Sequence, residues 1–129
     1  RVTMDLGANV TLTGGVALQT QESWCEFISK DAQSINFGGN AAELYFEEDA
    51  FDEFLEKLAA IKGLVYVHPV REHSWGQRVV RFYDPDRHIL EVGENMKSVC
   101  RRFLDSGMTV EAAARRMDVP EKFIRACTR

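Results

Sequence analysis

The feature that most constrains the fold is residues 80–92, where two alternating strands flank a short polar turn. Pro85 fixes the backbone angle φ at the first central position of the turn. Asp84 and Asp86 are able to accept hydrogen bonds from nearby backbone N–H groups. The segment therefore predicts a β-hairpin, with a loop over residues 84–87.

The second strand of this hairpin carries a carboxylate at Glu91, which is the best candidate for chemistry. Successive side chains in a strand point to opposite faces of the sheet, so Glu91 lies opposite the core face formed by Leu90 and Val92. With a loop at 84–87, Arg78 falls on the Glu91 face. We expect Arg78 either to bind a substrate carboxylate or to pair with Glu91.

A strand, a helix and three further strands account for residues 42–93. The pattern predicts strands at 42–48 and 64–67, a helix from Asp49 or Ala50 to Gly63, and a hairpin of strands 77–83 and 88–93. Five apolar side chains form one stripe along the helix, which is expected to face the core: Phe51, Phe54, Leu55, Leu58 and Ile61.

The first block has a similar ending, with strands expected at 2–6, 9–13 and 16–20, a short helix at 22–29 and a connector at 38–40. Its last strand matches the last strand of the second block, which suggests an internal repeat. In that case the first block lacks a leading strand and helix of about 25 residues, judged from the second block.

The chain turns helical from Asn95 to its end. Thr109 is a good N-cap and Pro120 a good first residue for two short helices, which together resemble a helix-turn-helix unit. Asp118 stands where that motif usually has glycine, and the second helix offers only three basic groups, Lys122, Arg125 and Arg129. We expect two domains, 1–94 and a helical extension at 95–129 that packs on the body or on another subunit.

Charge and composition exclude several function classes. Residues 1–94 hold 8 Lys and Arg against 16 Asp and Glu, a net charge of −8, whereas residues 95–129 hold 8 against 4, a net charge of +4. The acidic body argues against nucleic-acid binding. No apolar run approaches the roughly 20 residues of a membrane span, and no signal peptide is evident. The three cysteines show no paired motif, and we expect a cytoplasmic protein.

Two sequence motifs carry a resemblance to a known family. The first runs from Trp75-Gly76-Gln77-Arg78 into residues 82–86 and Glu91, and the second runs from residues 43–47 into the helix at 51–54. With them, the chain resembles the vicinal oxygen chelate superfamily, which includes glyoxalases, bleomycin-resistance proteins and extradiol dioxygenases. The resemblance implies an α+β fold, in which paired βαβββ modules form a mixed, curved sheet around a cavity. Modules of this family pair within one chain or across a homodimer, and we expect a homodimer here.

The resemblance also implies a divalent metal, Zn, Ni, Mn, Fe or Mg, held by Gln19, Glu43 and Glu91. A fourth ligand would precede Arg1. Oxygen donors of this kind suit a hard, open metal site that polarises substrate oxygens. In a glyoxalase-like reaction either Glu43 or Glu91 would move the proton.

Four residues are predicted to bind substrate around this site: Arg78, Trp75, His73 and Tyr45. His68 and His88 are expected to be structural. Two functions from different classes follow. One is a metal-dependent lyase, isomerase or dioxygenase acting on a small oxygenated molecule. The other is a metal-free module that binds a drug-like small molecule, and a ligand-sensing regulator that uses the helical tail is a weaker third.

Overall fold

The computed structural model describes residues 1–127, and the chain divides into two compact units, residues 1–37 and the residues from Gly38 onward. Arg129 lies outside the described residues. The first unit is a three-stranded antiparallel sheet in the order β1 (Val2–Asp5), β2 (Asn9–Leu12), β3 (Ala17–Gln19). Helix α1 (Gln21–Ile28) and a single 3₁₀ turn, η1 (Ala32–Ser34), follow. The three strands and the short helix expected from the sequence are confirmed.

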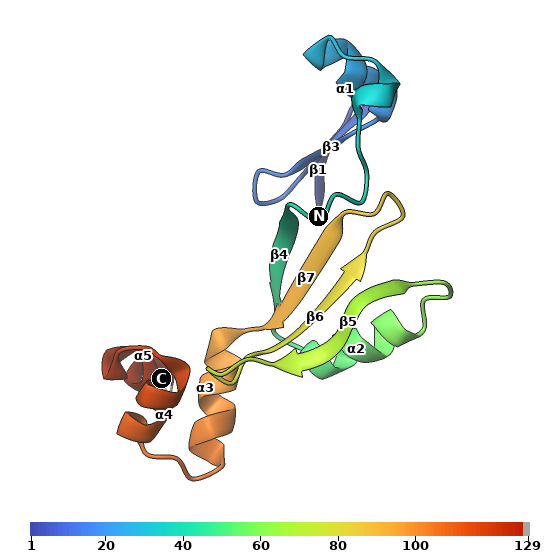
Figure 1. Cartoon of the computed structure of the whole chain (residues 1–129). Coiled ribbons are helices and arrows are strands. Elements are labelled where there is room, and N and C mark those ends of the chain that lie inside the picture. The colour runs from blue at the N-terminus through green and yellow to red at the C-terminus, as the bar shows by residue number, and fades with distance from the viewer. Residues whose placement is uncertain (128–129) are drawn as a thin grey trace. The chain divides into compact units, whose positions relative to one another are not determined.

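The second unit contains a four-stranded mixed sheet in the order β4 (Glu43–Glu48), β7 (Ile89–Glu94), β6 (Arg78–Tyr83), β5 (Val65–Glu72). Figure 1 shows these strands side by side, with α2 (Phe51–Ala59) beneath them. Strand β4 pairs with β7 in parallel, and the other neighbours are antiparallel. The predicted strand-helix-three-strand order is confirmed.

Helix α2 covers one face of this sheet. Phe51 and Leu58 of the helix pack with three strand residues in a buried cluster, Val80, Phe82 and Val92. Ile61 was expected in the same stripe, but the helix ends at Ala59 and the Ile61 side chain is 54% exposed. The opposite face of the sheet is thereby left without a helix from this module.

Three helices complete the second unit: α3 (Met96–Asp105), α4 (Val110–Met117) and α5 (Glu121–Cys127). They share a core of their own, which includes Val99, Phe103 and Ile124. The Thr109 side chain accepts a hydrogen bond from the N–H of Ala112, as expected for an N-cap. Among the described residues, no helix has the length and apolar character that crossing a membrane requires.

Candidate functional site

The candidate site is the face of the four-stranded sheet that α2 does not cover, which we call the site face. The register aligns Tyr45 of β4 with Glu91 of β7, and Glu91 with Arg81 of β6. Because directly paired residues point to the same side of a sheet, these three side chains share one face, together with Glu43. Glu43 and Glu91, which the resemblance assigns to one metal, thus lie on the same face of the sheet.

Arg81 lies between the two glutamates. Its Nε donates to Oε2 of Glu43 at 2.8 Å, and its Nη2 donates to Oε2 of Glu91. The remaining nitrogen, Nη1, lies 3.2 Å from Nε2 of His68. Since a guanidinium has only hydrogens to offer, Nε2 of His68 accepts, and Nδ1 donates to the carbonyl of Pro69 at 2.7 Å. One guanidinium therefore binds two carboxylates and an imidazole.

The two glutamates differ in acidity. The hydrogen bond from Arg81 holds the pKa of Glu43 below its ordinary value, against an opposing effect of burial. Burial raises the pKa of Glu91, and the neighbouring Glu43 adds to this effect. The Glu91 side chain is only 8% exposed, compared with 37% for Glu43. Glu43 therefore loses its proton at a lower pH than Glu91.

A chain of hydrogen bonds runs along the site face from Trp75. Its indole Nε1 donates to Oε1 of Gln77 at 3.2 Å, and Nε2 of Gln77 donates to the Tyr45 hydroxyl at 2.9 Å. The Tyr45 hydroxyl in turn donates to Glu47 at 3.2 Å. Gly93 makes room for this chain, because a Cβ there would lie 2.8 Å from Nε2 of Gln77. Burial raises the pKa of Tyr45, so the phenol stays protonated.

The ring of His73 stacks on Trp75, with ring centroids 4.2 Å apart and an interplanar angle of 17°. Burial, together with the positive charge of Arg81, lowers the pKa of His73. The structure therefore brings five of the predicted site residues onto or beside one face: Glu43, Tyr45, Glu91, His73 and Trp75.

Arg78 lies on the opposite face, so the expectation that it shares a face with Glu91 is wrong. The hairpin loop spans five residues, 84–88, because Tyr83 pairs with Ile89. This shift of one position moves every side chain of β6 to the other face. Arg78 instead pairs with Glu94 at 3.1 Å and with Asp52 at the start of α2 at 2.8 Å.

Gln19, the third predicted metal ligand, belongs to the first unit, where it pairs with Asn9 across the β2–β3 ladder. Its side-chain nitrogen is buried, and within the described residues it has no hydrogen-bond partner. Its role stays a prediction.

Sequence reasoning missed Arg81 and His68. A hairpin loop of five residues, had it been assumed, would have placed Arg81 directly opposite Glu91. His68 was assigned a structural role because it precedes Pro69. A bulge between β5 and β6 aligns His68 with Arg81, and such bulges leave no clear signal in the sequence.

The fit of a divalent metal to these residues is poor. Within residues 1–127, no three His, Cys, Asp or Glu side chains gather as a possible metal site. The two carboxylates that the resemblance assigned to the metal are both bound by the guanidinium of Arg81. A cation between them would meet the positive charge of Arg81 and would have to displace it.

The chain thus has the features of one class of α+β proteins. In this class a strand-helix-three-strand module presents polar groups from its first and last strands. Residues 1–97 match the model of the glyoxalase-like domain, and the chain belongs to this family. A comparison with curated proteins finds no match.

Solved structures agree with this assignment. A protein of unknown function from Agrobacterium tumefaciens str. C58 is 34% identical, with a TM-score of 0.62 and 74% of each chain covered. A glyoxalase-related enzyme from Fulvimarina pelagi has 19% identity and a TM-score of 0.57, with 74% of this chain and 70% of that chain covered. A lactoylglutathione lyase from Agrobacterium tumefaciens has 19% identity and a TM-score of 0.50, with 74% of each chain covered. The predicted α+β fold of the vicinal oxygen chelate superfamily is thereby confirmed.

Proposed function

We propose that this chain is a metal-independent member of the glyoxalase-like family that binds a small molecule on the site face. The observation that carries the proposal is Arg81, which holds Glu43 and Glu91 in one ion-pair cluster. A positive charge is thus already built into the position where a metal-dependent relative would need its cation.

The charges of the site face indicate the kind of ligand. Glu43, Glu47 and Glu91 carry acidic groups there, and Arg81 and Arg71 supply two positive charges. The three carboxyls outnumber the two guanidiniums, so the face suits a ligand with hydrogen-bond donors or positive charge. Trp75 and His73 would provide an apolar wall at one end, and the Tyr45 hydroxyl a polar contact near the centre.

The second candidate is a metal-dependent lyase, isomerase or dioxygenase. It is favoured by one observation, that Glu43 and Glu91 both reach a single guanidinium and so lie close enough to act together. In this alternative Glu43 and Glu91 would hold the metal in place of Arg81, and the metal would polarise substrate oxygens. The raised pKa of Glu91 also suits a group that exchanges protons.

Metal titration separates the two candidates. The untagged protein is incubated with Mn²⁺, Ni²⁺, Zn²⁺ or Fe²⁺, desalted, and its metal content per chain is measured beside a Glu43→Ala/Glu91→Ala double variant. We expect no stoichiometric metal in either protein. Arg81→Met should gain metal affinity, because it frees both carboxylates while keeping a side chain of similar length.

Arg115→Met is the control, since Arg115 is an exposed arginine on α4 and not on the site face, and its loss should leave metal binding unchanged. Near-stoichiometric metal in the unmodified protein that disappears in the double variant would overturn the proposal and establish the second candidate. The expected cytoplasmic location is a separate prediction.

A further inference from the structure

We propose that the C-terminal helices position the site face, because Arg102, Phe103 and Arg116 hold the 73–77 loop that carries Trp75 and Gln77. The inference rests on the proposed function only in taking the site face as the ligand-binding surface. The three holding residues lie beyond residue 97, where the family match ends. They are therefore an addition to the glyoxalase-like domain.

Arg116 of α4 contacts both the strand that enters the loop and the loop itself. Its Nη2 donates to Oε1 of Glu72 at 3.1 Å, and its Nη1 donates to the carbonyl of Ser74. A planar guanidinium is suited to such a double contact, since its donors are fixed in one fork. Arg116 thus ties α4 to the loop.

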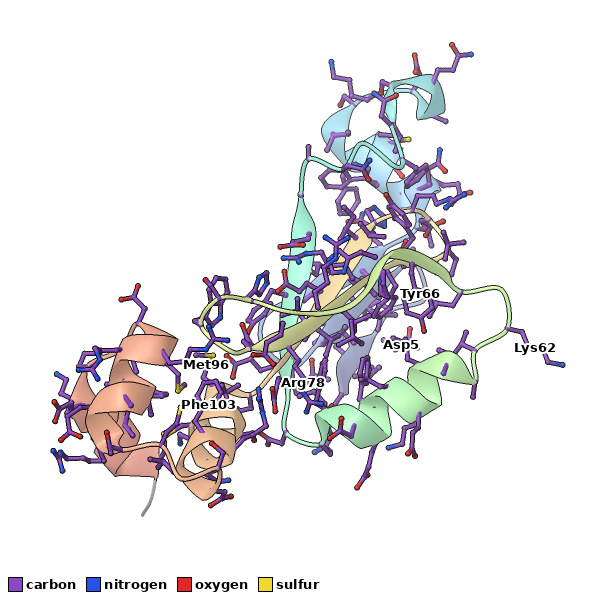
Figure 2. All side chains as sticks on the ribbon, turned by 60° about the horizontal axis from the view of Figure 1, so that its bottom comes forward. Asp5, Lys62, Tyr66, Arg78, Met96 and Phe103 are labelled. Atoms are coloured by element: carbon purple, nitrogen blue, oxygen red, sulfur yellow. The ribbon has the colours of Figure 1, made fainter. Side chains whose placement is uncertain are left out.

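Arg102 and Phe103 of α3 hold the other end of the loop. Nη2 of Arg102 donates to the carbonyl of Gly76 at 2.6 Å and to Oε2 of Glu94 at 3.1 Å. The Phe103 ring, labelled in Figure 2, packs so closely on Gly76 that a Cβ there would overlap its Cζ atom. Gly76 also has φ +87°, so glycine suits both the backbone and the contact.

Gln77, the last residue of the 73–77 loop, joins the loop to the site face. Gln77 is 5% exposed and donates to both the Tyr45 hydroxyl and the carbonyl of Glu94, the latter at 3.0 Å. Gln77 also accepts from Trp75. Movement of the loop would therefore shift Trp75 and release Tyr45 from its donor. Side-chain contacts thus connect α4 to the site face, in addition to the packing within the helical core.

The experiment uses the full chain with Trp24→Phe, so that Trp75 is the remaining tryptophan. Arg116→Ala is compared with Arg115→Ala, because the two neighbouring arginines carry the same charge in the last turn of α4. Two signals are followed without ligand or metal: Trp75 emission, and hydrogen exchange of the His73 and Gly76 amides. These amides donate to the Gln77 and His73 carbonyls within the loop.

Arg116→Ala should shift Trp75 emission to longer wavelength and speed exchange of both amides about tenfold, as expected when charge-assisted hydrogen bonds are lost. Arg115→Ala should change neither signal, and Arg116→Lys should recover part of the protection. Glu72→Gln removes the charge that pairs with Arg116 at 3.1 Å and with Arg102 at 3.7 Å, so it tests the hold of both helices on the loop without a change in either helix.

Unchanged signals in Arg116→Ala, or equal changes in Arg115→Ala, would overturn the inference. The inference would also be overturned if Arg116→Ala loosened the 73–77 loop only together with a loss of helical circular dichroism, while Glu72→Gln left the loop unchanged. Because no ligand or metal is used, these outcomes are independent of whether the proposed function holds.

Discussion

At the scale of single residues, the site depends on how Arg81 divides its charge between two glutamates. Glu43 has a lowered pKa, so its ion pair stabilises the fold above the unfolded-state value and is lost as pH falls below 4.5. Glu91 has a raised pKa, so its contribution is present below the unfolded-state value and is lost as pH rises through its folded pKa. The two carboxyls thus act on stability with opposite signs.

We predict that carbon-detected NMR titration of the glutamate side chains will find Glu43 below 4.5 and Glu91 above it. Arg81→Met should raise the pKa of Glu43, because the hydrogen bond from Arg81 is the largest cause of its shift. Arg115→Met, at an exposed arginine of α4, should leave both titrations in place. Identical pKa values of Glu43 and Glu91 in the unmodified protein would contradict this difference in acidity.

Strand periodicity was sufficient to place Glu91 opposite the core face of Leu90 and Val92, because successive side chains alternate across a sheet. It was not sufficient to identify Arg81. Whether a hairpin loop has four or five residues depends on the hydrogen bonds that Asp84 makes, and here its Oδ1 accepts from the N–H groups of Asp86 and His88. A difference of one residue exchanged Arg78 for Arg81 on the site face.

At the scale of elements, strand β5 shows why boundaries were harder to predict than element types. Its sequence was expected to leave the sheet near Pro69, but the strand continues to Glu72. Proline is tolerated there because β5 is an edge strand, where a missing N–H need not break a ladder. The register shifts between Tyr66 and Arg71 accommodate it.

The contact between the 73–77 loop and α3 leads to a prediction about two glycines. Gly76→Ala should cost about 3 kcal/mol of unfolding free energy, because it combines a left-handed backbone with a clash against Phe103. Gly107→Ala should cost about 1 kcal/mol, since Gly107 has a similar φ of +91° but an added Cβ would meet no atom within 4 Å. Urea unfolding measures both, and equal costs would show that the loop is not packed against α3.

At the scale of the whole molecule, the sequence predicted a homodimer, and the β4 edge of the four-stranded sheet offers a place for a partner. Strand β4 is six residues long, and in the described part of the chain it pairs only with β7. Leu44 and Phe46, on the core side of β4, are 40% and 47% exposed. An open edge with half-exposed apolar side chains favours pairing with another chain.

We predict that light scattering coupled to size-exclusion chromatography will give the mass of two chains, and that Phe46→Glu will give the mass of one. A glutamate at this position would place an unpaired charge in the interface, which is costly to bury. Val67→Glu is the matched control, because Val67 is a half-exposed apolar residue on β5, the other edge strand, and its variant should stay dimeric. Circular dichroism checks that each variant folds. A dimer that persists in Phe46→Glu but dissociates in Val67→Glu would show that the interface lies at the β5 edge. A single-chain mass for the unmodified protein would show that the site face operates within one chain.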